Sequence, residues 1–197
     1  MTRLFNFKRC VLETRVPLAG GGEAAVLTTH LDAFAQGTNT MERQVSAVLR
    51  LLGSLDSADV PWVIGGDFNL LPSDSAYSRL PQRQRAYFRP RTEIGPLSAR
   101  FQAVPSLQEA NGASHASWFT HFPNDPAGSA PDRTIDYIFV SDSMNLGTHR
   151  VRQADAMAIS DHFPVVAEVR VPAVLTQGTG PAPPVNKHAA SRPMMMQ

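Results

Sequence analysis

The sequence contains a single cysteine, Cys10, among its 197 residues. One cysteine excludes an intramolecular disulfide and a zinc site built from cysteines. No apolar run approaches the ~20 residues that a membrane-spanning helix requires, and residues 1–9 lack the long apolar segment of a secretory signal. These residues do not identify the cellular compartment of the protein. The cytoplasm is slightly favoured.

The chain also lacks an excess of charge of either sign. The 18 basic and 17 acidic residues give a formal net charge of +1, so no strong field draws the protein to long nucleic acid or to a membrane surface. Three catalytic motifs are absent as well: Gly-x-Ser-x-Gly, the Walker A loop and His-Glu-x-x-His. Serine hydrolases, nucleotide-driven motors and zinc proteases are therefore poor interpretations.

What the sequence does have is a set of apolar runs that each end in polar groups. The run from Val60 to Ile64 stops at two glycines and is followed by Asp67 and Asn69. Residues two apart point to the same side of a strand, so both polar groups can face one site. Three other segments have this form, and they carry His30, Asp136 and the adjacent pair Asp161 and His162.

Each segment also has an ordinary explanation. Asp67 and Asn69 follow glycines, as in a tight turn. His30 alone could be an ordinary core or surface histidine, and Asp161 with His162 could be a capped turn. Asp136 is harder to explain in this way, because an acid inside an apolar strand needs a partner. The conjunction of all four segments favours a shared site.

The residue types point to a hard cation. Carboxylates and a carboxamide without cysteine suit Mg²⁺, Mn²⁺ or Ca²⁺. Together with an acid–histidine pair that manages the proton of an attacking water, such a cation suits hydrolysis at phosphorus. We interpret His115, His121 and His149 as loop residues outside the site, although Thr120 and His121 are placed where they could approach it.

The N-terminal third predicts a strand–helix–strand unit. Residues 10–16 and 24–29 form a β-hairpin around three glycines, an amphipathic helix covers about 40–53, and a strand covers 60–65. Asn39 followed by Glu42 is a reasonable helix start. This order favours an α/β layered fold.

The rest of the chain is less regular. Within the proline-rich stretch 71–128 we expect short helices near 74–80 and 97–102. A group of arginines at 79–91 is interpreted as a solvated face rather than a nucleic-acid track. Three strands follow, at 133–140, 147–154 and 163–171. We expect one domain over 1–171 and a disordered tail over 172–197, because the tail offers no core.

Taken in order, the segments around His30, Asp67–Asn69, Asp136 and Asp161–His162 resemble the motifs of the endonuclease/exonuclease/phosphatase superfamily. The resemblance covers about 10–171. It implies an α/β four-layer sandwich, in which two packed mixed β-sheets are flanked by helices and the site lies at one rim. It also implies hydrolysis of phosphoester bonds with Mg²⁺ (or Mn²⁺).

Carried over by position, the resemblance implies a role for each residue. His162 is the catalytic histidine and Asp136 orients it. Asp67 positions or activates the water, with Asn69 beside it on the phosphate. His30 contacts the phosphate and stabilises the pentavalent state. The implied metal ligands are Asp161 and Asp67.

The resemblance also implies an asparagine and a metal-binding glutamate upstream of His30, which only 29 residues precede. Glu13 and Glu23 belong to the predicted hairpin and are not assigned this role. We therefore expect a domain that is N-terminally truncated.

The alternative function is a catalytically impaired fragment or a non-catalytic binding module of the same fold. The expected substrate is a small phosphorylated metabolite, a phospholipid head group or nucleic acid, with no stable protein partner and a monomeric chain.

Overall fold

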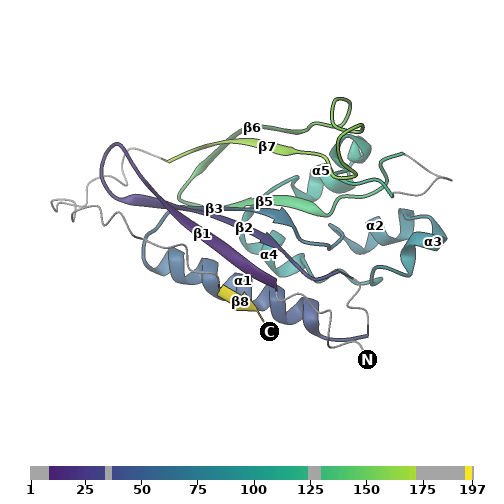
Figure 1. Cartoon of the computed structure of the whole chain (residues 1–197), viewed down its shortest axis with the longest axis horizontal. Coiled ribbons are helices and arrows are strands. Elements are labelled where there is room, and N and C mark those ends of the chain that lie inside the picture. The colour runs from purple at the N-terminus through teal and green to yellow at the C-terminus, as the bar shows by residue number, and fades with distance from the viewer. Residues whose placement is uncertain (1–8, 34–36, 124–129, 172–193, 197) are drawn as a thin grey trace.

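The computed structural model describes residues 9–33, 37–123, 130–171 and 194–196. These residues form a six-stranded sheet and a separate two-stranded sheet, with helices beside them (Figure 1). The strands are β1 (Arg9–Pro17), β2 (Glu23–His30), β3 (Trp62–Asp67), β4 (Gln102–Val104), β5 (Asp136–Val140), β6 (Asn145–Val151), β7 (Val165–Arg170) and β8 (Met194–Met196). The helices are α1 (Thr40–Ser57), α2 (Asp74–Arg79), α3 (Gln82–Arg85), α4 (Gly95–Arg100), α5 (Leu107–Asn111) and the 3₁₀ turn η2 (His115–Trp118).

The large sheet has the strand order β4-β5-β3-β2-β1-β8. β1 and β2 form the predicted antiparallel hairpin, whose turn contains Gly21 and Gly22 with positive φ angles of 96° and 75°. β2 and β3 pair in parallel and are joined through α1, which confirms the predicted strand–helix–strand unit. β5 then runs antiparallel to β3, so the start of β5 lies beside the end of β3.

The helix α1 is longer than its sequence pattern predicted. It begins after Asn39, as expected, but it runs through Gly53 to Ser57. Leu52 and Leu55 are both buried, and burying an apolar side chain favours another turn by more than one glycine disfavours it. The predicted end at Gly53 was wrong for this reason.

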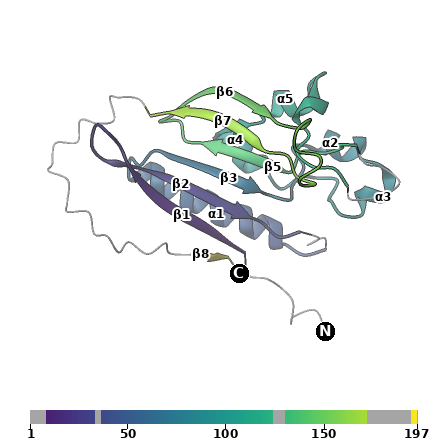
Figure 2. The same ribbon diagram turned by 45° about the horizontal axis from the view of Figure 1, so that its top comes forward.

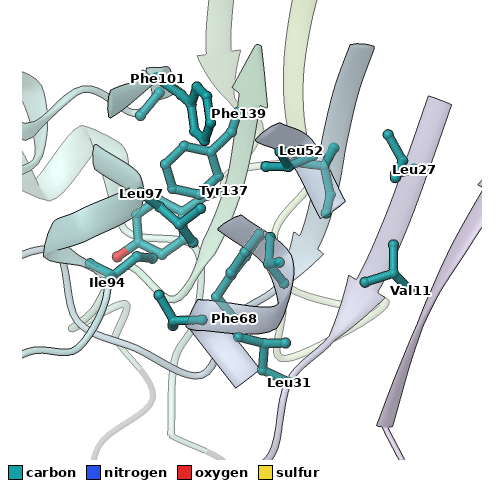
Figure 3. Packing of buried hydrophobic residues seen from close by; sticks show 14 of the residues in the cluster. Val11, Leu27, Leu31, Leu52, Phe68, Ile94, Leu97, Phe101, Tyr137 and Phe139 are labelled. Carbon is teal, nitrogen blue, oxygen red and sulfur yellow. The ribbon is translucent and has the colours of Figure 1, made fainter. Parts of the chain in front are cut away.

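The main core lies between the large sheet and the helices α1 and α4. Figure 3 shows Leu52 from α1 and Ile94 and Leu97 from the α4 region on the same side as the aromatic residues of the sheet. The Phe68 ring meets those of Tyr137 and Phe139 edge to face, with centroids 5.9 and 5.2 Å apart. Such pairs add to the stabilisation that burial alone gives.

The two-stranded sheet β6–β7 lies on the opposite side of the large sheet from α1 (Figures 1 and 2). Val63 and Ile138 of the large sheet share a second apolar cluster with Leu146 and Val169. The strands β3 and β5 are therefore covered on both faces, as expected for central strands. Two packed sheets with flanking helices confirm the predicted α/β sandwich class.

The proline-rich stretch contains α2 and α4 close to their predicted positions. It also contains α3, α5 and the short strand β4, which were not predicted because elements of three to five residues leave no periodic pattern. Three of its arginines form contacts within the stretch: Arg79 donates to the Ala110 carbonyl, Arg85 to the Leu80 carbonyl, and Arg89 pairs with Glu93 at 3.2 Å. Arg79, Arg83 and Arg91 are exposed and Arg85 and Arg89 are partly buried, so the interpretation as a solvated face holds for the exposed members of the group.

Most of the predicted disordered tail lies outside the described residues. Met194–Met196 pair with β1 as strand β8, and the division of the chain at residue 171 stays a prediction. Among the described residues, no helix combines the length and the apolar character needed to cross a membrane.

Candidate active site at the rim of the sheet

Three of the predicted site residues lie in one row across the large sheet. In the strand pairing His30 is opposite Asp67, and Asp67 is opposite Asp136. Residues in register point to the same face of a sheet, here the face that carries Val63 and Ile138 towards β6–β7. The row lies where β2 and β3 end and β5 begins, at the rim of the sheet (Figure 1).

The side chains of His30, Asp67 and Asn69 form one connected group. His30 Nε2 lies 3.3 Å from Asp67 Oδ2. Asn69 donates to the same carboxylate twice, from its backbone N–H at 2.8 Å and from Nδ2 at 3.1 Å. The Asn69 side chain also donates to the Leu31 carbonyl at 3.2 Å, and its φ of 52° is a left-handed conformation that asparagine tolerates. Asn69 therefore has a fixed orientation beside Asp67.

His162 reaches the row from the segment that precedes β7. Its Nδ1 lies 3.0 and 3.1 Å from the two carboxylate oxygens of Asp136. The hydrogen bond to Asp136 raises the pKa of His162, against the opposing effect of burial. With Nδ1 donating to the carboxylate, Nε2 is the ring nitrogen that can exchange a proton with a reactant.

The electrostatics of Asp67 bear on whether a cation fits here. Burial, and then the negative charge of Asp136, raise the pKa of Asp67 to about 6. Ligand atoms of Asp67, Asp136 and His162 all lie within 4.8 Å of one another. A divalent cation beside them would offset both the desolvation and the repulsion of the two carboxylates. Since the donors are mostly oxygens, this group fits a hard cation such as Mg²⁺.

Asp161 belongs to a second group of possible ligands, with His121 and His162. Its Oδ2 lies 3.9 Å from His121 Nε2. The two predicted metal ligands, Asp67 and Asp161, are thus not within one close set of ligand atoms, although both sets contain His162. The structure brings the predicted residues together around His162 and not around one evident coordination point.

His121, which the sequence analysis left outside the site but placed where it could approach it, is a neighbour of His162. Its ring packs edge to face on the ring of His162, with centroids 4.6 Å apart. Burial, and then the charges of Arg133 and His162, lower the pKa of His121 to about 4. The signal for this residue was weak, because it rests only on its position just before the loop that leads to β5. His115 and His149 lie outside the site: His115 is hydrogen-bonded to the Gly112 carbonyl and His149 to Glu109.

The sequence and the fold correspond to a known family of hydrolases that act on phosphoester bonds. The sequence profile of the endonuclease/exonuclease/phosphatase family matches residues 8–162, and the chain belongs to this family. The predicted family assignment is confirmed. A comparison with curated proteins gave no match.

Solved structures of similar fold were also found. An endonuclease/exonuclease/phosphatase from Beutenbergia cavernae is 24% identical, with a TM-score of 0.53 over 83% of this chain and 39% of its own. The human Nocturnin catalytic domain is 18% identical, with a TM-score of 0.55; the match covers 82% of this chain and 52% of the Nocturnin chain. The 3′-5′ exonuclease NExo from Neisseria meningitidis is 22% identical, with a TM-score of 0.57; the match covers 81% of this chain and 65% of the NExo chain. The chain thus spans between about two fifths and two thirds of the length of these structures, and the likeness concerns the fold.

Proposed function

We propose that this chain carries the catalytic groups of a metal-dependent phosphoesterase, which hydrolyses phosphodiester or phosphomonoester bonds by attack of water. The observation that carries this proposal is the contact of 3.0 Å between His162 Nδ1 and Asp136, directly beside the group formed by Asp67 and Asn69. A carboxylate that holds an imidazole in one tautomer, next to further acids, is an arrangement suited to moving the proton of a water or a leaving group.

The roles follow from chemistry and position. Asp136 accepts from Nδ1 of His162 and leaves Nε2 to exchange a proton. Asp67 activates or positions the attacking water, since it lies in register between His30 and Asp136. His30, in contact with Asp67, offers an N–H donor to a phosphate oxygen. Asn69 lies beside it, with its amide held by Asp67 and the Leu31 carbonyl.

Asp67, with Asp161 across the site, would hold Mg²⁺ or Mn²⁺. When bound, such a cation neutralises charge on the phosphate oxygens.

A second candidate function is a binding module that has lost catalysis. The observation that favours it is an uncovered part of the large sheet. Leu12, Val16 and Val26 are 40%, 41% and 43% exposed and lie on neighbouring positions of one face of β1 and β2. With this face uncovered, the same groups would bind a phosphate compound without turning it over.

Hydrolysis of bis-p-nitrophenyl phosphate with Mg²⁺ or Mn²⁺ separates the two functions. We expect turnover that is abolished by EDTA and by His162→Ala. His115→Ala is the matched control, because that histidine contacts Phe119 and the Gly112 carbonyl and none of the proposed catalytic groups. Turnover that survives both EDTA and His162→Ala contradicts the mechanism, and phosphate binding without any turnover supports the binding module.

A further inference from the structure

The fully buried residue Thr120 lies between the two segments that carry the acid–histidine pair. Its hydroxyl oxygen accepts hydrogen bonds from the backbone N–H groups of Ile135 and Asp136, each at 3.0 Å. Its carbonyl oxygen accepts from the N–H of Phe163 at 2.7 Å. One residue is therefore bonded to Asp136 on one side and to the neighbour of His162 on the other.

The segment around Thr120 is itself held at both ends. The N–H of Thr120 donates to the Arg133 carbonyl at 2.9 Å, and the N–H of Phe122 donates to the Asp161 carbonyl at 3.1 Å. His121, between them, forms isolated bridges with both Arg133 and His162. Residues 120–122 thus connect the start of β5 to the segment before β7; among the described strands, no pairing joins β5 to β7.

We propose that Thr120 is a positioning residue that sets the distance between Asp136 and His162. This inference rests on the proposed function, since it concerns the same pair. The hydroxyl fixes the backbone of Asp136, and the carbonyl fixes the backbone next to His162. Because both contacts belong to one buried residue with 0% exposure, neither half of the pair can move without disturbing the other.

The chemistry of the side chain explains why a hydroxyl is needed here. Two backbone N–H groups converge on a single oxygen, and a buried N–H without an acceptor is unfavourable. Valine has nearly the same shape as threonine but no acceptor, so Thr120→Val leaves both N–H groups unpaired. Serine keeps the oxygen, so Thr120→Ser should restore the arrangement.

The chain offers a matched control in Thr134. This threonine is also buried, at 2% exposure, and its hydroxyl donates to the Trp118 carbonyl at 2.7 Å. Thr134→Val therefore removes one buried hydroxyl and one hydrogen bond from the same neighbourhood but leaves the N–H groups of Ile135 and Asp136 paired with Thr120.

The first test is kinetic, with bis-p-nitrophenyl phosphate and Mg²⁺. We expect Thr120→Val to lower kcat by about 10- to 100-fold, as a displaced catalytic group does, with a smaller change in KM because His30 and Asn69 are untouched. Thr120→Ser and Thr134→Val should keep kcat near that of the unaltered protein. Equal losses in Thr120→Val and Thr134→Val overturn the proposal.

The second test does not depend on turnover, so it separates this inference from the proposed function. The Nδ1–H proton that His162 donates to Asp136 is identified by NMR as the signal that His162→Gln removes. We expect Thr120→Val to shift or lose this signal, and Thr134→Val to leave it in place. A signal unchanged in Thr120→Val overturns the proposal even where no hydrolysis is detected.

A third measurement needs no substitution and covers the case in which Thr120→Val does not fold. The amide protons of Ile135, Asp136 and Phe163 should exchange slowly with solvent and at similar rates, because one residue accepts from all three. Exchange of any of them as fast as that of an exposed loop amide overturns the proposal.

Discussion

Two adjacent glycines in β3 should respond very differently to the same substitution. A Cβ added to Gly66 would lie 1.9 Å from the Thr29 carbonyl oxygen and 2.9 Å from the Thr29 carbonyl carbon. Gly66 also has a φ of 154°, a conformation that side chains other than glycine rarely adopt. A Cβ added to Gly65 would meet its nearest atoms, Ile138 Cγ1 and the Tyr137 oxygen, at 3.6 and 3.7 Å, which is ordinary contact.

The size of the effect follows from this geometry. To admit Gly66→Ala, β2 and β3 must move apart by roughly 1 Å, which lengthens their hydrogen bonds beyond the useful range. Losing one or two such bonds costs about 1–3 kcal/mol, and the backbone strain costs about 1–3 kcal/mol more. We therefore expect Gly66→Ala to destabilise the protein by about 2–6 kcal/mol. Gly65→Ala should be neutral or stabilise by roughly 0.5 kcal/mol, since glycine in a strand is unfavourable.

Thermal unfolding followed by circular dichroism measures both variants. At about 2–4 °C per kcal/mol for a chain of this size, Gly66→Ala should lower the Tm by roughly 10 °C, and Gly65→Ala should leave it within about 2 °C. Equal Tm values for the two variants would refute the close approach of β2 and β3, and with it the register that brings His30 beside Asp67.

Three further outcomes are expected. Asp136→Asn should lower kcat by about 10²- to 10⁴-fold, the range of a general base that loses its partner, and rates with bis-p-nitrophenyl phosphate that stay within threefold of the unaltered protein would contradict its role. Phe68→Ala should lower the free energy of unfolding in urea by about 3–5 kcal/mol, because Phe68 is fully buried between Tyr137 and Phe139; a loss below about 1 kcal/mol would contradict the described core. His149→Gln should destabilise the protein at about pH 6 by roughly 0.5 kcal/mol and by less at about pH 8.5, as measured by urea unfolding at both pH values.

The sign of the last effect follows from the two partners. Burial lowers the pKa of His149, but hydrogen bonds to the Gly147 carbonyl and to Glu109 raise it above 6.5 overall. The stabilisation is therefore complete below pH 6.5 and is lost as the pH rises through the raised pKa. Burial raises the pKa of Glu109, yet hydrogen bonds from Ser106 and His149 lower it below 4.5, so its share is lost only in acid. A larger effect of His149→Gln at about pH 8.5 would contradict this pairing.

The sequence predicted the strands that hold the site better than the contacts that assemble it. Alternating and apolar runs located β1, β2, β3 and β5, because each strand is covered on at least one face and its pattern records that burial. Polar groups at the ends of such runs then marked Asp67 and Asp136. That β3 lies between β2 and β5 did not follow from any local pattern, because pairing between remote strands depends on packing over the whole sheet.

For Thr120 and His121 the sequence predicted only that they could approach the site, and not which contacts they make. They lie in an irregular segment, and their positions are set by hydrogen bonds to Arg133, Asp136 and Phe163. No periodicity records such contacts. The end of α1 was missed for a related reason, since burial of Leu55 outweighed the glycine that precedes it.

The central claim is that His30, Asp67, Asp136 and His162 belong to one site, at which Asp67 and Asp161 would hold a divalent cation. Titration with Mn²⁺ while the histidine ring signals are followed by NMR tests it most directly, because this ion broadens the signals of nuclei close to it. The account predicts that the His30 and His162 signals broaden first and that Asp67→Asn weakens the effect, while His115 and His149 stay sharp. Equal broadening of all four histidines, or broadening of His115 and His149 first, would contradict the account.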